Sequence, residues 1–131
     1  MISSRNLMRG DLVYCKRWGG NKVERVDAIE NGEIKLEFCA TYTYEGTLEP
    51  IPITAETLKA NGFVFRENIS AWWHINPKDS FFSDFELSEM DGFYMLNGFA
   101  FAEIRFIHEL QHALRLCGLN GLADNFKVLT K

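Results

Sequence analysis

Three residues near the C-terminus, His108, Glu109 and His112, have the types and the spacing of the zinc-hydrolase motif H-E-x-x-H. On an α-helix, residues four apart lie one turn apart on the same face, so two imidazoles at this spacing can share a zinc ion. The glutamate between them is then placed to act as general base toward a zinc-bound water. The motif therefore predicts one candidate chemistry, a minimal zinc-dependent hydrolase with Glu109 as its catalytic residue.

This chemistry needs a third protein ligand, because catalytic zinc generally takes three protein ligands and a water. The extended metzincin motif is excluded, since Arg115 and Gly118 occupy its glycine and final histidine positions. No glutamate follows Glu109, so the third ligand would be Asp124 or His74. A cationic Arg115 beside a divalent metal also costs electrostatic energy. The sequence therefore favours a site without a cofactor, with zinc on His108, His112 and Asp124 as the alternative.

The element that must position this motif is a predicted amphipathic helix over residues 103–119. At about 100° per residue its apolar side chains fall in one arc and predict a buried stripe: Phe106, Ile107, Leu110, Ala113, Leu114 and Cys117. The polar side chains share the opposite face and predict an exposed interaction surface: His108, Gln111, His112 and Arg115. Gly118 ends the helix. We expect this helix to close the core of a sheet.

The first 50 residues consist of short strand-like runs separated by turns. The runs are 12–15, 22–30, 34–38 and 41–44, and Asn31-Gly32 is a strong hairpin signal between two of them. Such spacing predicts a small, strongly bent sheet or an SH3-like barrel. Pro50 and Pro52 remove donors from any strand ladder and end this module. The predicted domains are residues 1–50 and 51–131, packed together as one compact unit.

The second module is predicted to be an antiparallel meander with helices. Thr54 and Gly62 bracket a short helix over residues 55–61, and strands follow at 63–66, 69–75, 81–87 and 93–96. Trp72 and Trp73 are adjacent in one strand and therefore point to opposite faces, so Trp72 is a further candidate for the interaction surface. The predicted fold class is α+β: an N-terminal SH3-like small β-barrel, then an antiparallel sheet packed by a short helix and a C-terminal amphipathic helix.

The charge distribution suggests a second kind of partner. The 131 residues carry a net charge of -4, which disfavours nonspecific binding to nucleic acid. However, the first 26 residues are locally basic, and Lys16, Arg17 and Lys22 are candidate contacts to phosphate. A solvated face without a partner explains the same pattern. Nucleic acid is therefore a possible partner of the N-terminal module, and a protein is the favoured one.

The compartment is predicted from what the sequence lacks. No apolar run reaches the roughly 18 residues that cross a bilayer, and the N-terminus lacks the apolar core of a secretory signal. The three cysteines are widely separated and indicate neither a disulfide framework nor a thiolate metal site. We expect a cytoplasmic protein that has no membrane partner.

The order of several motifs resembles a family of short uncharacterised proteins of gut Bacteroidetes and their phages or mobile elements. The matching segments are 7–14, Lys22-Val23, 48–58, 61–63 and the helix from 104 to 118. In that family the C-terminal helix carries H-x-L-Q, so Glu109 and His112 stand where relatives carry Gln and Asn. The resemblance implies a phage-related or mobile-element origin and no established activity.

Two functional hypotheses follow. The first is a noncatalytic binding or adaptor module, which uses the N-terminal barrel or the polar face of the C-terminal helix. The second is the zinc-dependent hydrolase. The sequence favours the first, because a third zinc ligand is not evident.

Overall fold

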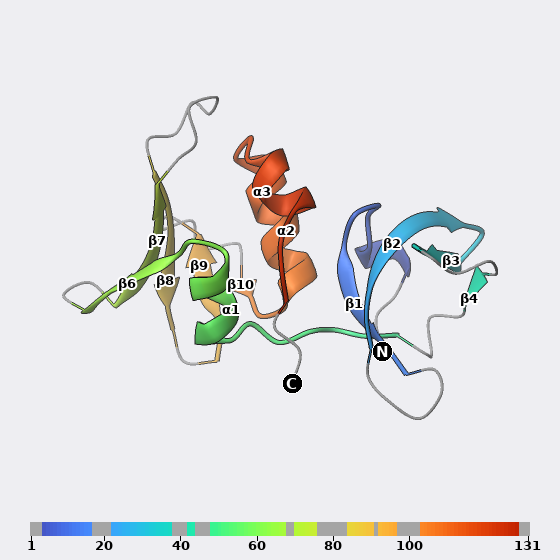
Figure 1. The fold of residues 1–131 in the computed structure, drawn as a ribbon, viewed down its shortest axis with the longest axis horizontal. Helices are drawn as coiled ribbons and strands as arrows, with labels where there is room; N and C mark the ends of the chain where they lie inside the picture. The colour runs from blue at the N-terminus through green and yellow to red at the C-terminus, as the bar shows by residue number, and fades with distance from the viewer. Residues whose placement is uncertain are drawn as a thin grey trace. The chain divides into compact units, whose positions relative to one another are not determined.

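The computed structural model describes residues 4–16, 22–37, 42–43, 48–67, 70–75, 84–90, 92–96 and 103–128. It divides into two compact units, residues 1–52 and 53–131, and each contains one five-stranded antiparallel sheet (Figure 1). The described part of the second unit also carries three α-helices. The predicted α+β class is therefore confirmed. The units divide after Pro52, whereas the sequence predicts a boundary after residue 50.

A short 3-10 helix, η1 (Ser4–Asn6), opens the first unit, whose sheet has the order β4-β3-β2-β1-β5. Its strands are β1 (Leu12–Cys15), β2 (Lys22–Glu30), β3 (Glu33–Leu36), β4 (Tyr42–Thr43) and β5 (Leu48–Glu49). The predicted hairpin is present, since Asn31 and Gly32 both have positive φ between β2 and β3. The sequence does not predict β5, which pairs back onto β1.

Residues on these strands, together with Leu7 after η1, build the core of the first unit. The buried members are Leu7, Val13, Cys15, Val26, Ile34, Leu36 and Leu48. The register of β2 against β3 shifts between Val26 and Ala28, and an irregularity of this kind bends a strand. The sheet is open, because no pairing within the described residues joins β4 to β5. The predicted SH3-like barrel is therefore not confirmed.

The second unit contains the predicted antiparallel meander, with the sheet order β10-β9-β8-β7-β6. Its strands are β6 (Val64–Arg66), β7 (Ala71–Ile75), β8 (Asp84–Glu89), β9 (Tyr94–Leu96) and β10 (Glu103–Ile104). Phe65, Trp72 and Leu87 stand directly opposite one another on neighbouring strands. Since Trp72 and Leu87 are buried, this row lies on the core face of the sheet.

The helices are α1 (Ala55–Ala60), α2 (Ile107–Leu116) and α3 (Asn120–Asp124). Thr54 caps α1 as predicted, because its hydroxyl accepts a hydrogen bond from the backbone N–H of Thr57 at 3.2 Å. The predicted start of the last helix at residue 103 is wrong. Residues 103 and 104 are extended and pair with β9, so α2 begins at Ile107. None of the described helices is long and apolar enough to span a bilayer.

Candidate functional site

The structure places the motif on α2, but with a different exposure from the predicted one. The buried stripe is confirmed for Ile107, Leu110, Ala113, Leu114 and Cys117. The prediction that His108 and Gln111 lie on an exposed face is wrong, since their exposed fractions are 5% and 0%. Placing residues at 100° steps identifies the apolar side of a helix, but in the structure a wider arc of α2 is buried. The sequence gives little indication of α3, which contacts α2 at Gln111, because α3 is only five residues long.

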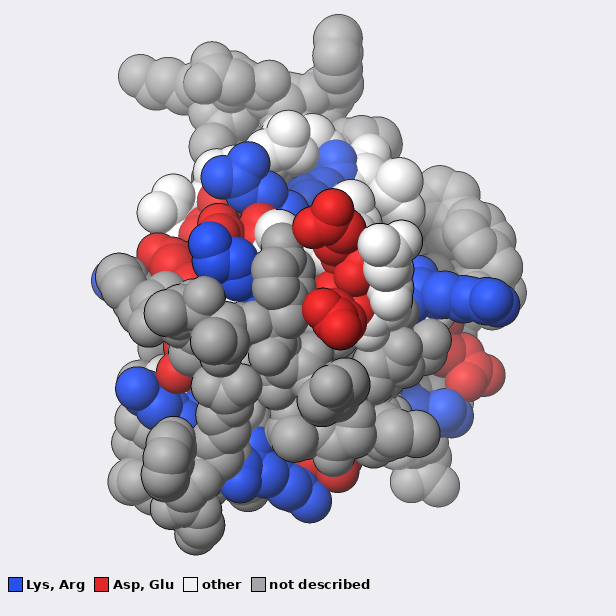
Figure 2. All heavy atoms as spheres, turned by 90° about the vertical axis from the view of Figure 1, so that its right-hand side faces the viewer, with Lys and Arg blue, Asp and Glu red and all other residues white. Residues whose placement is uncertain are grey.

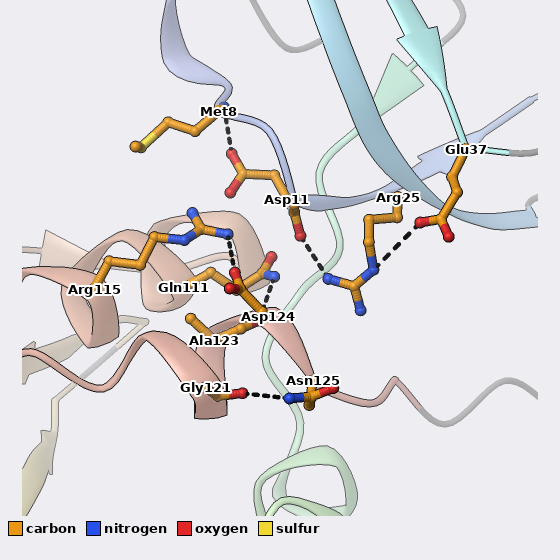
Figure 3. Close-up of polar contacts among 11 residues, drawn as sticks. Met8, Asp11, Arg25, Glu37, Gln111, Arg115, Gly121, Ala123, Asp124 and Asn125 are labelled. Atoms are coloured by element: carbon orange, nitrogen blue, oxygen red, sulfur yellow. Dashed lines mark hydrogen bonds and ion pairs between the residues drawn. The ribbon is translucent and has the colours of Figure 1, made fainter. Parts of the chain in front are cut away.

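Gln111 has a defined structural role at this covered side of α2. Its Nε2 donates a hydrogen bond to the backbone oxygen of Ala123 in α3 at 3.0 Å (Figure 3). A buried amide needs such a partner, because an unsatisfied polar group in the interior costs free energy. Gln111 therefore joins α2 to α3, and its amide is committed to this contact.

Glu109, the candidate general base, is engaged by the backbone at the start of α2. Its Oε1 accepts hydrogen bonds from the backbone N–H groups of Arg105 at 2.9 Å and Phe106 at 3.0 Å. Phe106 stands at the N-cap, where its side chain has no acceptor to offer. The carboxylate in the third position of the helix supplies that acceptor from within the first turn, as in one half of a capping box. Glu109 therefore stabilises the helix start.

The two histidines of the motif lie together on α2. Their ring centroids are 5.9 Å apart, with the ring planes at 80°. The His108 ring also stacks on Phe106, with centroids 6.1 Å apart and planes at 8°. Spacing by one helical turn thus brings the imidazoles close together, as the sequence predicts, and one of them is packed against an aromatic ring.

The third ligand of the zinc alternative is not assembled in the described part of the chain. Asp124 faces Arg115 instead, with Oδ1 3.6 Å from the guanidinium (Figure 3). The backbone of His74 lies in β7, and its side chain is outside the described residues. Among the described side chains, no group of three His, Cys, Asp or Glu residues is arranged to hold a metal ion.

Five described basic residues of the first unit lie within ion-pair distance of carboxylates. Lys16 lies 3.2 Å from Glu49, and Lys22 lies 3.4 Å from Glu24. Other pairs join Arg25 to Glu37, and both Arg9 and Lys35 to Asp27. Arg17, the remaining candidate, is outside the described residues. Figure 2 shows basic and acidic side chains interspersed on the face that it displays. The described basic residues therefore do not form a continuous positive surface.

Trp72 is buried, so the prediction that it belongs to an exposed interaction surface is wrong. It is 4% exposed, and its ring lies 5.1 Å from that of Phe65 on the neighbouring strand. Its indole Nε1 is buried and has no hydrogen-bond partner among the described groups. Packing of Trp72 against Phe65, across β6 and β7, explains why Trp72 is buried.

Among the described residues five large apolar side chains are exposed, and the sequence does not predict the two with the largest exposed fractions, Val64 and Leu116. Val64 is 55% exposed on β6, a strand at the edge of the second sheet. Leu116 is 85% exposed at the end of α2, one turn beyond His112. The alternation Phe63-Val64-Phe65 contains a signal for the first, because turning the buried Phe63 and the half-buried Phe65 toward the core turns the valine to the other face.

Comparisons with known proteins add no further constraint on this site: no protein-family model, no curated protein and no solved structure matches the chain.

Proposed function

We propose that the protein is a noncatalytic binding or adaptor module whose partner is another protein. The observation that carries this proposal is the position of the Glu109 carboxylate, which accepts two backbone hydrogen bonds at the start of α2. A general base needs an oxygen directed at a water or a substrate, whereas Oε1 of Glu109 is directed at the backbone. The Asp124 pair with Arg115 and the burial of Gln111 point in the same direction, since the other polar groups near the motif also serve the fold.

The charge pattern favours a protein over nucleic acid as the partner. The first unit, residues 1–52, has seven basic and eight acidic side chains. Phosphate binding releases counterions only where cationic groups are available to replace them. Lys16 and Lys22 would first have to leave Glu49 and Glu24. We therefore consider a nucleic-acid partner less well supported than a protein partner.

The proposed architecture of the first unit is an SH3-like small barrel, of phage-related or mobile-element origin. The support is the return of β5 onto β1, which makes the first and last strands of the unit neighbours. The bend of β2 at Val26 and Ala28 brings a small sheet closer to closure. The family resemblance of the sequence supports the origin.

The zinc-dependent hydrolase is tested by metal analysis of protein purified without a metal-affinity tag. We expect less than about 0.1 equivalent of zinc, because no third ligand joins the two histidines among the described side chains. The variant His112→Ala is the control, and it should leave the metal content unchanged. Stoichiometric zinc that is lost in His112→Ala would replace our proposal by the hydrolase.

The partner class is tested by two experiments on the full chain. We expect no retention on heparin at about 0.15 M salt, where a paired basic surface binds poorly. Retention that disappears in a Lys16→Ala, Lys22→Ala double variant would favour nucleic acid instead.

The second experiment places a photocrosslinking residue at Val64 or Leu116 in the host cell, with Lys59 as the exposed polar control. Exposed apolar side chains are enriched where proteins meet. We expect one discrete adduct of higher mass at an apolar position and none at the control. Failure to obtain such an adduct from a folded protein would contradict an interaction at these positions.

A further inference from the structure

The chain segment after α3 is held in place by a side chain from α1. Residues 126–128 lie outside any helix or strand. The backbone N–H of Lys127 donates to Oδ1 of Asn61 at 2.8 Å, and Nδ2 of Asn61 donates to the backbone oxygen of Lys127 at 2.7 Å. One primary amide thus pairs with both main-chain groups of one residue, as a neighbouring strand would.

Asn61 is well positioned for this contact before Lys127 arrives. It stands at the C-cap of α1, where its backbone N–H donates to Leu58 at 3.1 Å. Its Nδ2 also donates to the backbone oxygen of Thr57 at 2.8 Å. The side chain is therefore oriented by α1, and little conformational entropy is lost when Lys127 binds to it.

The segment has a second anchor of a different kind. Phe126, next to Lys127, is fully buried, whereas the hydrogen bonds between Lys127 and Asn61 lie at the surface. Water competes for exposed hydrogen bonds, so each contributes only a modest net stabilisation. Releasing residues 126–128 also breaks no strand pairing, because the segment is not part of either sheet. Local opening of such a segment is expected to cost less than unfolding the unit.

We propose that residues 126–128 form a C-terminal strap latched by Asn61, which opens and closes while the rest of the second unit stays folded. Opening removes Phe126 from its buried position. This inference does not depend on the proposed binding function.

The test is NMR hydrogen exchange on the full chain, with the amide of Lys127 compared with that of Leu114 in α2. We expect Lys127 to exchange at least tenfold faster than Leu114. In Asn61→Ala the exchange of Lys127 should rise by a further factor of about five to ten, which is the loss of roughly one net hydrogen bond. Leu114 should not change.

Asn125→Ala is the matched control, because Nδ2 of Asn125 donates to the backbone oxygen of Gly121 and does not contact the latch. This variant should leave Lys127 exchange within about twofold of the wild type. Asn61→Asp covers the case in which Asn61→Ala does not fold, since it retains an acceptor for Lys127 and loses the donor. Equal exchange of Lys127 and Leu114 in the wild type, or an equal rise of both in the Asn61 variant, would overturn the strap.

Discussion

Glu109 shows how a residue type that is common in catalysis can serve the backbone instead. Its carboxylate accepts hydrogen bonds from the backbone N–H groups of the two residues that precede α2, and one of these is the N-cap Phe106, whose own side chain has no acceptor. A negative charge in the first turn also interacts favourably with the helix dipole. The same position in an H-E-x-x-H enzyme would direct this carboxylate toward a metal-bound water.

Replacing Glu109 separates these two roles. We expect Glu109→Ala to lower the free energy of unfolding by about 1 kcal/mol, the typical contribution of a helix cap. Glu109→Gln, which keeps an acceptor oxygen, should lose less. The measurement is urea denaturation followed by far-UV circular dichroism. Unchanged stability in Glu109→Ala would show that the carboxylate does not cap α2 in solution.

Trp72 provides a second prediction at the scale of one residue. Its ring packs on Phe65, while its buried Nε1 finds no acceptor among the described groups. Trp72→Phe removes this donor and keeps an aromatic ring. The smaller ring leaves a cavity, which destabilises the fold, but the variant no longer buries an N–H without an acceptor, which partly offsets that loss. We expect a change of less than about 1 kcal/mol in the free energy of unfolding, against about 3–5 kcal/mol for Trp72→Ala. Equal losses in the two variants would indicate that the indole N–H has a partner in solution.

Cys117 allows a test by chemical modification. Burial raises the pKa of its thiol above the ordinary value of 9.0. Because the thiolate is the reactive form, alkylation of the native protein at pH 8 should be much slower than in urea. Because the thiol pKa of Cys117 is higher in the folded than in the unfolded protein, its protonated form contributes to the stability of the fold below the unfolded-state pKa. This contribution is lost as the pH rises through the folded-state pKa. Peptide-resolved mass spectrometry measures the labelling of Cys117 separately from the other cysteines, and equal native and unfolded rates would contradict its burial.

At the scale of elements, the contact of α2 with α3 explains why Gln111, beside the H-E-x-x-H motif, is buried and not exposed as predicted. The sequence pattern predicts one buried stripe correctly, and it also predicts the short helix α1, the meander and the Asn31-Gly32 hairpin. It misses β5, β10 and α3, which are too short to show a period of their own. Since α3 accepts the hydrogen bond of Gln111, missing this helix also meant misplacing a polar residue on the outside.

Gln111→Met tests the link between these helices with a side chain of similar length. The variant keeps a flexible apolar volume and leaves the oxygen of Ala123 without this buried donor. We expect a loss of about 1–3 kcal/mol in the free energy of unfolding, the cost of a buried group that loses its partner. Hydrogen exchange in α3 should rise more than in β7. A stability change within about 0.5 kcal/mol would mean that water replaces the amide at this position.

At the scale of the whole molecule, the sequence predicts the α+β class better than it predicts the surface. Composition and hydrophobic patterning depend on many residues, so single errors do not change the α+β result. The surface depends on individual pairs such as Lys16 with Glu49, which are far apart in the sequence. The sequence therefore shows that the N-terminal segment is locally basic, but it does not show that carboxylates later in the chain, such as Glu49, pair with this segment.

The order of strands in the two sheets has a consequence for how the chain folds. In the second unit every strand pairs with the next one along the chain, so each ladder can form from a short loop. In the first unit the pairing of Tyr14 with Glu49 must wait until the intervening strands have come together. Contacts between distant residues slow folding, because the entropy of closing the loop is lost before the contact is made. We expect β5 to join β1 late, so substitutions in β5 should speed unfolding of the first unit and leave its folding rate nearly unchanged.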